Sequence, residues 1–319
     1  MSTKISDKLL RSLSPTREIG AHKWGVGGVL VIAGSPAYPG ASWLASRSAG
    51  RNSAGIVYLA TPRGVIATMA SAMPEVAFVP LPDTDAPGSA RRAVERLHDP
   101  LQKVKAVVVG PGLGDDDSTN LLLSTLFGFG ERADRGGFNI GFGGDSLPAA
   151  AHESIFDLTD APVVLDADGL NWLARQGEWW QHMPAQRLVL TPHPGEAQRL
   201  SGIDIKEIVA DPAGTAKTLA GKWNQVVVIK SGFAAVSDGK TTLVADLAPT
   251  SLATAGSGDC LAGAIGAFVA QGCAPIDAVT LAIGIGSRAA TDLERIWGIG
   301  GVIATDLPDA MAKAMLALS

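Results

Sequence analysis

Residues 252–272 read LATAGSGDCLAGAIGAFVAQG, a glycine-containing turn followed by a run of small apolar residues. Its small apolar residues predict a helix that packs closely on a sheet, and its glycines allow an anion to approach the backbone. The N-terminus of a helix presents unpaired N–H groups and a partial positive charge. We therefore predict that Gly256, Ser257 and Gly258 form an anion hole, unless Ser257 or Asp259 serves only as a helix N-cap.

Asp259 is the one acidic residue of this stretch. At the start of the helix, we expect its carboxylate to stay ionised. It would then be placed to accept a proton from a hydroxyl that attacks a phosphoryl group held in the anion hole. Asp259 is thus the candidate catalytic base.

The rest of the chain alternates apolar strands with helical segments. The pattern predicts strands within residues 27–34, 55–62, 104–114, 161–166, 187–192 and 225–232, a helix over 40–54, and a hairpin at Asp238-Gly239. Strands that are apolar on both faces are typical of a mostly parallel sheet covered by helices on both sides. We predict one α/β domain over residues 1–319, with a glycine-rich insertion at 127–147 that is either a lid or a loop without a role.

Composition excludes several classes of protein. A net charge of −5 and a pI near 5.5 argue against binding to nucleic acid or to an anionic membrane surface. Cys260 and Cys273 are too few for a disulfide scaffold and indicate reduced thiols. The first residues lack a signal-peptide core, and the apolar run 261–270 is too short to span a bilayer. These features predict a cytoplasmic protein.

Polar and glycine residues follow the predicted strands. Ligands bind beyond the carboxyl ends of strands in open parallel sheets, so these residues are expected to line one cleft. They are Gly34-Ser35, residues 110–114 (GPGLG), Asp166-Ala167-Asp168, residues 191–196 (TPHPGE) and Lys230-Ser231-Gly232. The spacing fits neither a P-loop nor a dinucleotide fingerprint, and no Cys/His cluster has zinc spacing. Residues 115–117 (DDD) are better explained as the start of a helix over 118–127 than as a metal site.

Taken together, these motifs resemble those of a known family. His22-Lys23-Trp24-Gly25, VLVIAGS, Tyr38-Pro39-Gly40-Ala41, GPGLG, DADGLN, TPHPGE and AGSGD occur in the order seen in ADP- or ATP-dependent NAD(P)H-hydrate dehydratases. The resemblance covers about residues 20–310 and implies a ribokinase-like three-layer α/β/α sandwich. In that family a nucleotide phosphorylates the hydroxyl of NAD(P)H hydrate, and elimination of phosphate restores NAD(P)H. Bacterial members typically use ADP.

The resemblance also implies roles for individual residues. Asp259 looks like the base, Gly256 and Gly258 belong to the anion hole, and Lys230, Ser231, Gly232 and Gly258 lie at the nucleotide. Ala41, Gly112, His193 and Asp259 would contact the hydrate. Asp166, Asp168 and Asn171 either orient substrate or magnesium-bound phosphate, or serve only as strand-end and cap residues.

The cofactor expected from the resemblance is Mg²⁺, held by phosphates and water without a protein cage. The expected partners are NAD(P)H hydrate, ADP or ATP, and a separate epimerase if epimerisation is needed. A homo-oligomer is expected if Trp179 and Trp180 cover a partner; the alternative places them in the core.

Two alternative functions remain, and two departures from the family pattern motivate the second of them. Ala255 stands where the family usually has glycine, and residues 248–252 (APTSL) replace its Gly/Asn/Pro-rich lead-in. One alternative is a kinase of the same fold that acts on a vitamin-precursor alcohol and releases a stable phosphate ester. The other is a catalytically weak protein that binds nucleotide or NAD(P)H.

Overall fold

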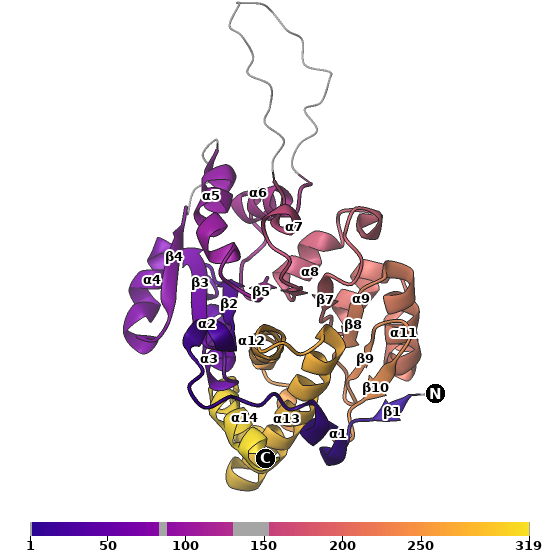
Figure 1. Cartoon of the computed structure of the whole chain (residues 1–319). Helices are drawn as coiled ribbons and strands as arrows, with labels where there is room; N and C mark the ends of the chain where they lie inside the picture. Colours follow the sequence, from indigo (N-terminus) through magenta and orange to yellow (C-terminus); the bar gives the residue numbers. More distant parts are fainter. Residues whose placement is uncertain (1, 83–87, 130–152, 319) are drawn as a thin grey trace, which may run out of the picture.

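The computed structural model describes residues 2–82, 88–129 and 153–318. Its centre is a ten-stranded sheet in the spatial order β1-β10-β9-β8-β7-β6-β5-β2-β3-β4 (Figure 1). The strands are β1 (Thr3–Lys4), β2 (Gly28–Ile32), β3 (Ile56–Pro62), β4 (Ala77–Leu81), β5 (Ala106–Val109), β6 (Val163–Leu165), β7 (Leu188–Leu190), β8 (Val226–Ile229), β9 (Ala235–Ser237) and β10 (Thr242–Val244).

The sheet is mostly parallel, which confirms the prediction. The strands from β4 to β8 in the spatial order pair in parallel, with Val31 of β2 opposite Val108 of β5. β9 runs antiparallel to both β8 and β10. The predicted hairpin at Asp238-Gly239 joins β9 to β10, where Ser237 pairs with Thr242.

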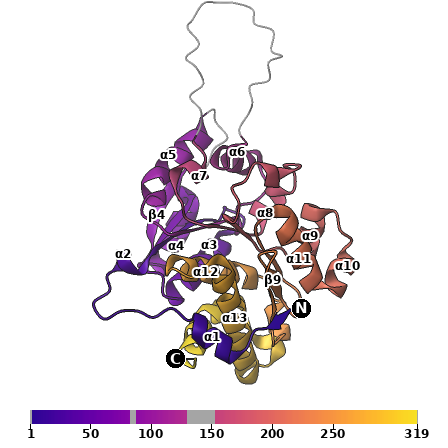
Figure 2. The ribbon, with the colours of Figure 1, turned by 45° about the vertical axis from the view of Figure 1, so that its right-hand side comes forward.

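Helices cover both faces of the sheet, because alternate strand residues point to opposite sides. Val29 and Val31 of β2 belong to one core and Leu30 and Ile32 to the other. The first core is covered by α1 (Asp7–Leu13), α3 (Pro39–Arg51), α12 (Ser257–Ala270), α13 (Pro275–Trp297) and α14 (Leu307–Leu316). The second is covered by α5 (Ser89–Leu101), α6 (Asp117–Leu126), α7 (Ile155–Leu158), α8 (Asp168–Leu173), α9 (Pro194–Ser201), α10 (Ile205–Ala210) and α11 (Pro212–Trp223). Figure 2 shows these layers on either side of the strands, as a three-layer sandwich requires.

The remaining elements are short. α2 (Lys23–Val26) and α4 (Arg63–Met69) flank the β2–β3 side of the sheet, and the 3₁₀ turns are η1 (Ala70–Ala72), η2 (Trp179–Gln181), η3 (Thr250–Leu252), η4 (Ile299–Gly301) and η5 (Ala304–Asp306). None of the helices in the described ranges is both long and apolar enough to cross a bilayer.

Helix α12 lies directly on the centre of the sheet, and its small residues permit this. A Cβ at Gly266 would come within 2.6 Å of Cγ2 of Val108, and one at Gly263 within 2.1 Å of the carbonyl oxygen of Ala45 in α3. Larger residues would therefore push α12 away from both neighbours. The close packing predicted from sequence is confirmed, and it fixes the position of the Gly-Ser-Gly-Asp turn.

Some predictions need correction or lie outside the description. Trp179 is fully buried against Trp223, with ring centroids 5.1 Å apart, so it belongs to the core and does not cover a partner. The helix expected over 40–54 ends at Arg51. Asp116 caps α6 by accepting a hydrogen bond from the Thr119 N–H, as the helix-start interpretation of residues 115–117 predicts. Of the predicted insertion at 127–147, residues 130–147 lie outside the described residues.

Candidate active site at the carboxyl edge of the sheet

The first turn of α12 has no side-chain cap. Gly256 occupies the N-cap position with a φ of +91°, and the Ser257 hydroxyl donates to the carbonyl oxygen of Leu252. Neither Ser257 nor Asp259 therefore caps the helix, and the simpler N-cap explanation of this turn is wrong. The Ser257 N–H donates to the carbonyl oxygen of Thr254, so the predicted anion hole is corrected to the N–H groups of Gly256 and Gly258.

Lys230 and Asp166 form a buried ion pair beside this turn. Lys230 follows β8 and Asp166 follows β6, and Nζ of Lys230 lies 2.5 Å from Oδ1 of Asp166. The Thr191 hydroxyl donates to the same oxygen at 2.7 Å. A Cβ at Gly258 would lie 3.2 Å from Nζ of Lys230, so the ammonium group sits against the first turn of α12. Adding a positive charge to a helix N-terminus strengthens the site for a phosphate.

Asp259 lies within the electrostatic reach of this pair. Burial and then the negative charge of Asp166 raise the pKa of Asp259 to about 7, although Lys230 opposes the shift. The expectation that Asp259 stays ionised is thereby corrected, since both forms are populated near neutral pH. A pKa near neutrality also makes its carboxylate a much stronger proton acceptor than an ordinary aspartate.

Glu196, which the sequence predicts only as part of the TPHPGE segment lining the cleft, belongs to this charge cluster. Its side chain is buried, and Oε2 lies 3.9 Å from Nζ of Lys230. Burial raises the pKa of Glu196 to about 7 against the opposing charge of Lys230. Burial alone would lower the pKa of Lys230, but Asp166 and Glu196 together shift it upward. Lys230 is therefore a permanent cation between two acidic groups.

Gly112 and Ala41 meet at a second part of the same edge. Gly112 follows β5 with a φ of +61°, and a Cβ there would lie 2.6 Å from Cβ of Ala41 and 2.8 Å from the carbonyl oxygen of Tyr38. Ala41 is in the first turn of α3. The structure thus brings together two of the residues predicted to contact the hydrate.

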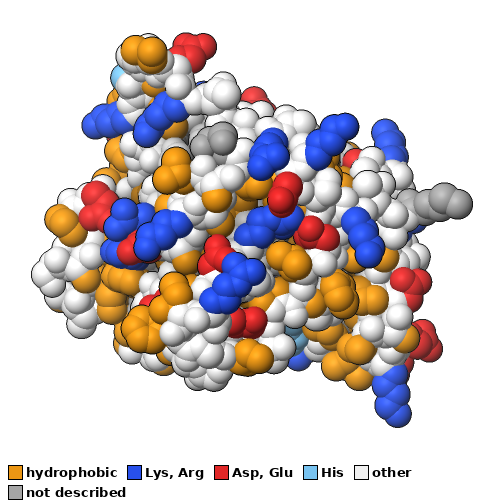
Figure 3. Space-filling model, turned by 90° about the horizontal axis from the view of Figure 1, so that it is seen from below, with side chains coloured by type: hydrophobic (Ala, Val, Ile, Leu, Met, Phe, Trp, Pro, Cys, Tyr) orange, Lys and Arg blue, Asp and Glu red, His pale blue; other side chains and the backbone are white. Residues whose placement is uncertain are grey.

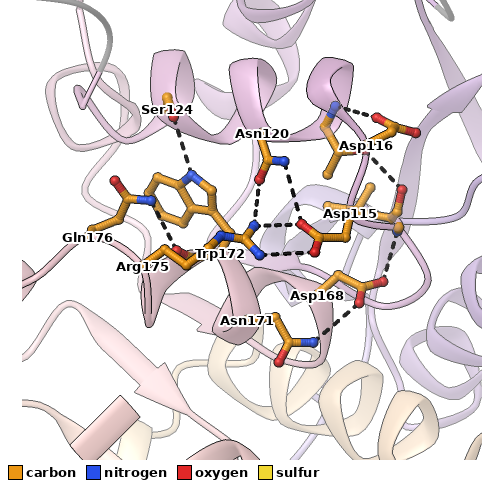
Figure 4. Close-up of polar contacts among 12 residues, drawn as sticks. Asp115, Asp116, Asn120, Ser124, Asp168, Asn171, Trp172, Arg175 and Gln176 are labelled. Atoms are coloured by element: carbon orange, nitrogen blue, oxygen red, sulfur yellow. Dashed lines mark hydrogen bonds and ion pairs between the residues drawn. The ribbon is translucent and has the colours of Figure 1, made fainter. Parts of the chain in front are cut away.

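Gly112 belongs to the loop between β5 and α6. Polar contacts hold this loop against the turn after β6. Oδ2 of Asp168 accepts a hydrogen bond from the Gly114 N–H at 2.8 Å, and the Arg175 guanidinium binds both carboxylate oxygens of Asp115 (Figure 4). The amide of Asn171 donates to Oδ1 of Asp168. Asp168 thus joins the β5–α6 loop to the β6–α8 turn, whereas Asn171 holds Asp168 and accepts a hydrogen bond from Arg199 of α9.

His193 begins α9. Its Nδ1 accepts hydrogen bonds from the N–H groups of Gly195 and Glu196, while Oε2 of Glu196 accepts from the His193 N–H. This reciprocal capping box holds the imidazole at the end of β7, beside Lys230. The predicted site residues of β5, β6, β7, β8 and α12 therefore gather at one edge of the sheet.

A cavity of about 440 Å³ lies next to the first turn of α12. Lys230, Ser231, Gly232, Ser257 and Gly258 line it where it meets the charge cluster. Its remaining wall is mostly apolar and comes from residues 248–253, α13, Leu307 and Met311. This cavity suits a ligand with a flat apolar base and a phosphate chain. The base would lie against the apolar wall, and the phosphates would reach Lys230 and Gly258.

Neither departure from the family pattern disrupts the backbone of the site. Ala255 is exposed, and it is not among the described non-glycine residues with a positive φ. Residues 248–252, which include η3, form part of the cavity wall. The Cβ of Ala255 is therefore accommodated without strain.

The carboxylates of the site provide the hard oxygen ligands that Mg²⁺ prefers. The two oxygens of Asp166 differ: Oδ1 binds Lys230 and Thr191, whereas Oδ2 lies 3.6 Å from the position of a Cβ at Gly258. In the described part of the chain, no three His, Cys, Asp or Glu side chains are grouped to hold a metal by themselves. The donor set fits an ion that takes one or two carboxylates and draws its other ligands from phosphate and water.

Comparison with known proteins identifies the family of these motifs. A family model described as NAD(P)H-hydrate dehydratase matches residues 29–129 and 138–313. The ADP-dependent (S)-NAD(P)H-hydrate dehydratase of Xanthomonas campestris is 32% identical over 292 residues, which cover 91% of this chain and 88% of that protein. The bifunctional NAD(P)H-hydrate repair enzyme of Salinibacter ruber is 33% identical over 313 residues, which cover 97% of this chain and 52% of that protein. The chain thus spans about half the length of the bifunctional relatives it matches.

Solved structures share the fold. A hypothetical protein of Streptococcus mutans superposes with a TM-score of 0.79 at 24% identity, covering 99% of this chain and 100% of that one. The ADP/ATP-dependent NAD(P)H-hydrate dehydratase of Bacillus subtilis, co-crystallised with ATP and Mg²⁺, gives 0.75 at 22% identity, covering 100% and 99%. An Enterococcus faecalis protein described as ribokinase-like gives 0.77 at 20% identity, covering 100% and 96%. The predicted ribokinase-like sandwich is confirmed.

Proposed function

The chain belongs to the NAD(P)H-hydrate dehydratase family, and we propose that it converts the S epimer of NAD(P)H hydrate to NAD(P)H with ADP or ATP as phosphoryl donor. The single observation that carries this proposal is the placement of Asp259, Lys230 and Gly258 around one helix N-terminus beside the cavity. A base, a cation and free backbone N–H groups are the parts that phosphoryl transfer to a hydroxyl needs.

The first step is phosphorylation of the hydrate hydroxyl. Asp259 accepts the hydroxyl proton as the oxygen attacks the terminal phosphorus, and the bond from phosphorus to the rest of the nucleotide breaks. AMP leaves when the donor is ADP, and ADP leaves when it is ATP. Lys230 and the N–H groups of Gly256 and Gly258 stabilise the charge on the transferred phosphoryl oxygens.

The second step is elimination. The carbon–oxygen bond breaks, phosphate leaves with the electron pair, and the ring nitrogen donates electrons to the carbon that it leaves. Loss of a proton from the neighbouring ring carbon then restores the double bond of NAD(P)H. Ala41, Gly112 and His193 are proposed to hold the nicotinamide ring in place for both steps.

We propose Mg²⁺ as the cofactor, with Asp166 and Asp168 as the side chains nearest to the phosphate groups. When bound, Mg²⁺ supplies positive charge to the phosphate oxygens. Lys230 already neutralises the charge of Asp166. The remaining negative charge would suit a single divalent ion and not a cage of carboxylates.

Partners and location are part of the same proposal. An epimerase that converts the R hydrate to the S form is the proposed functional partner. The unpaired Cys260 and Cys273 suit a reducing cytoplasm. A homo-oligomer is supported by Ile296, Trp297 and Ile299, which are exposed at the end of α13. Hydrophobic side chains also gather among charged ones on the face seen in Figure 3.

The test is direct. Purified protein is incubated with enzymatically hydrated NADH, Mg²⁺ and either ADP or ATP, and recovery of the reduced-nicotinamide absorbance is followed. Recovery with one nucleotide supports the proposal and names the donor. If hydrate is phosphorylated but no NADH returns, the second step fails; if only another alcohol is phosphorylated, the chain is a kinase. If nucleotide binds without any turnover, the chain is a binding protein.

A further inference from the structure

The two ring nitrogens of His193 are in different situations. Nδ1 accepts hydrogen bonds from the backbone N–H groups of Gly195 at 3.0 Å and Glu196 at 3.3 Å. A backbone N–H can only donate, so Nδ1 must present its lone pair to both. In the neutral ring the proton is therefore on Nε2.

The surroundings also oppose a second proton on this ring. Protonation of Nδ1 would break both hydrogen bonds and place a cation at the positive end of α9. Burial lowers the pKa of His193, and the positive charges of Lys230 and Arg199 lower it further, against a weaker opposing contribution from Asp166. The neutral Nε2–H form is thus the form that a substrate meets.

The Nε2–H group itself has no fixed acceptor. Nε2 lies 3.4 Å from Oε1 of Glu196, but the hydrogen bonds formed by the His193 ring within the described residues are those to Nδ1. Glu196 instead uses Oε2 to accept the backbone N–H of His193 at 2.8 Å. About half of the His193 side chain is exposed at the edge of the sheet, so a ligand there can reach Nε2–H.

We propose that His193 binds the substrate only as a hydrogen-bond donor through Nε2–H and takes no proton during the reaction. This inference rests on the proposed function and deepens it, because elimination requires a base for a ring-carbon proton, and an imidazole next to the ring would otherwise be the obvious choice. Nδ1 is occupied by two donors, and Nε2 already carries its proton.

The chemistry of the hydrate selects the acceptor. The hydroxyl oxygen must use a lone pair to attack phosphorus while Asp259 takes its proton, so a donor on that oxygen would weaken the nucleophile. The carboxamide oxygen of the same ring does not react, and it is the acceptor left for Nε2–H. His193 would then fix the rotation of the ring with respect to Asp259, which is a contribution to substrate binding and orientation.

The tautomer can be measured without any activity. Protein labelled with ¹⁵N at both ring nitrogens of histidine is observed by two-bond ¹H–¹⁵N correlation, and His193 is assigned by the loss of its signals in His193→Asn. We expect an unprotonated Nδ1 and a protonated Nε2 across neutral pH. A His193 ring with a protonated Nδ1 at neutral pH would overturn the proposal, whatever the enzyme does.

Two variants separate the role of each nitrogen. Asparagine is a strong N-cap, so His193→Asn keeps the acceptor for the α9 N–H groups but loses the donor at the Nε2 position. Glutamine places an amide N–H near the Nε2 position, so His193→Gln keeps the donor and loses the cap. For His193→Asn we expect an unchanged melting temperature, a KM for the hydrate raised about 3- to 10-fold, and an unchanged pH profile of kcat. For His193→Gln we expect a lower melting temperature with a KM near that of the wild type.

The outcomes are distinct. If both variants lose kcat by more than about 100-fold together with a histidine-like limb of the pH profile, His193 is a base and the proposal is wrong. If neither variant changes KM, the contact with substrate does not exist. If the wild type turns over no hydrate, the proposed function fails, while the NMR result still decides the tautomer.

Discussion

The ammonium nitrogen of Lys230 lies 2.5 Å from Oδ1 of Asp166, whose side chain is buried, while the Lys230 side chain keeps 19% of its surface exposed. Residues 64 positions apart in the chain thereby meet at the N-terminus of a third element, α12. The pair has two consequences: it leaves a cation against Gly258, and it keeps a negative charge close to Asp259. The pair therefore acts on the affinity for phosphate and also adds to the effect of burial on the pKa of Asp259.

Replacement of Lys230 by methionine should destabilise the fold and weaken nucleotide binding together. It leaves Asp166 buried without its cation, which typically costs about 3–5 kcal/mol in the free energy of unfolding. Denaturant unfolding and nucleotide titration measure the two effects. The double variant Lys230→Met with Asp166→Asn should recover part of the stability but not the affinity. Lys222→Met is a control, because that ammonium lies at the surface over the ring of Trp180. An equally large loss of stability in Lys222→Met would show that the buried charge of Asp166 is not the cause.

Replacement of Asp259 by asparagine should abolish turnover and leave nucleotide binding intact. The amide keeps the shape of the carboxylate but cannot accept the hydroxyl proton, and loss of a general base costs about 10²- to 10⁴-fold in rate. Recovery of reduced-nicotinamide absorbance measures turnover, and equilibrium titration measures binding. Asp277→Asn serves as a matched control, since that carboxyl also has a pKa raised by burial but lies at the start of α13. Wild-type turnover in Asp259→Asn would show that Asp259 is not the base.

The raised pKa of Asp259 predicts a specific pH dependence of stability. The pKa is about 7 in the folded chain against an ordinary value of 3.8, so the folded state binds a proton that the unfolded state has released. Stability should accordingly fall as pH rises from about 4 to about 7 and then level off. Asp259→Asn removes this contribution, so its melting temperature minus that of the wild type should be more positive near pH 8 than near pH 5. Glu196→Gln should act in the same direction. If the difference in melting temperature between Asp259→Asn and the wild type does not change with pH, the pKa of Asp259 is not raised in the folded chain.

The sequence predicts the centre of this molecule better than its edges. The small residues of α12 and the apolar β2 specify a helix on a parallel sheet, and both were predicted close to their observed bounds. The edge strands were not predicted, because β1 has only two residues and β4 contains Pro80, which is typical of an edge.

The sequence also predicts some features of the site and not others. Motif residues at strand ends predict where Lys230 and Asp166 lie, since the carboxyl ends of parallel strands share one edge. The motif places Glu196 at the cleft but predicts no role for it, because a glutamate three residues after an N-cap is a common capping signal. The sequence does not predict the raised pKa of Asp259, because it depends first on burial and then on Asp166, and only the fold produces both.

Replacement of Gly112 by alanine should raise the KM for the hydrate by about 10-fold or more, with a smaller effect on nucleotide affinity. The new methyl group would lie 2.6 Å from Cβ of Ala41, at a residue whose φ of +61° already disfavours a side chain. Either α3 or the β5–α6 loop must move, and the loop is held by Asp168 through Gly114. Gly64→Ala is the control, because a Cβ there meets no atom within 4 Å. KM and the nucleotide dissociation constant, measured for both variants, separate a local effect from general destabilisation. If Gly112→Ala instead weakens nucleotide binding and leaves KM unchanged, the hydrate does not bind between Ala41 and Gly112, and the two substrates must be placed the other way round.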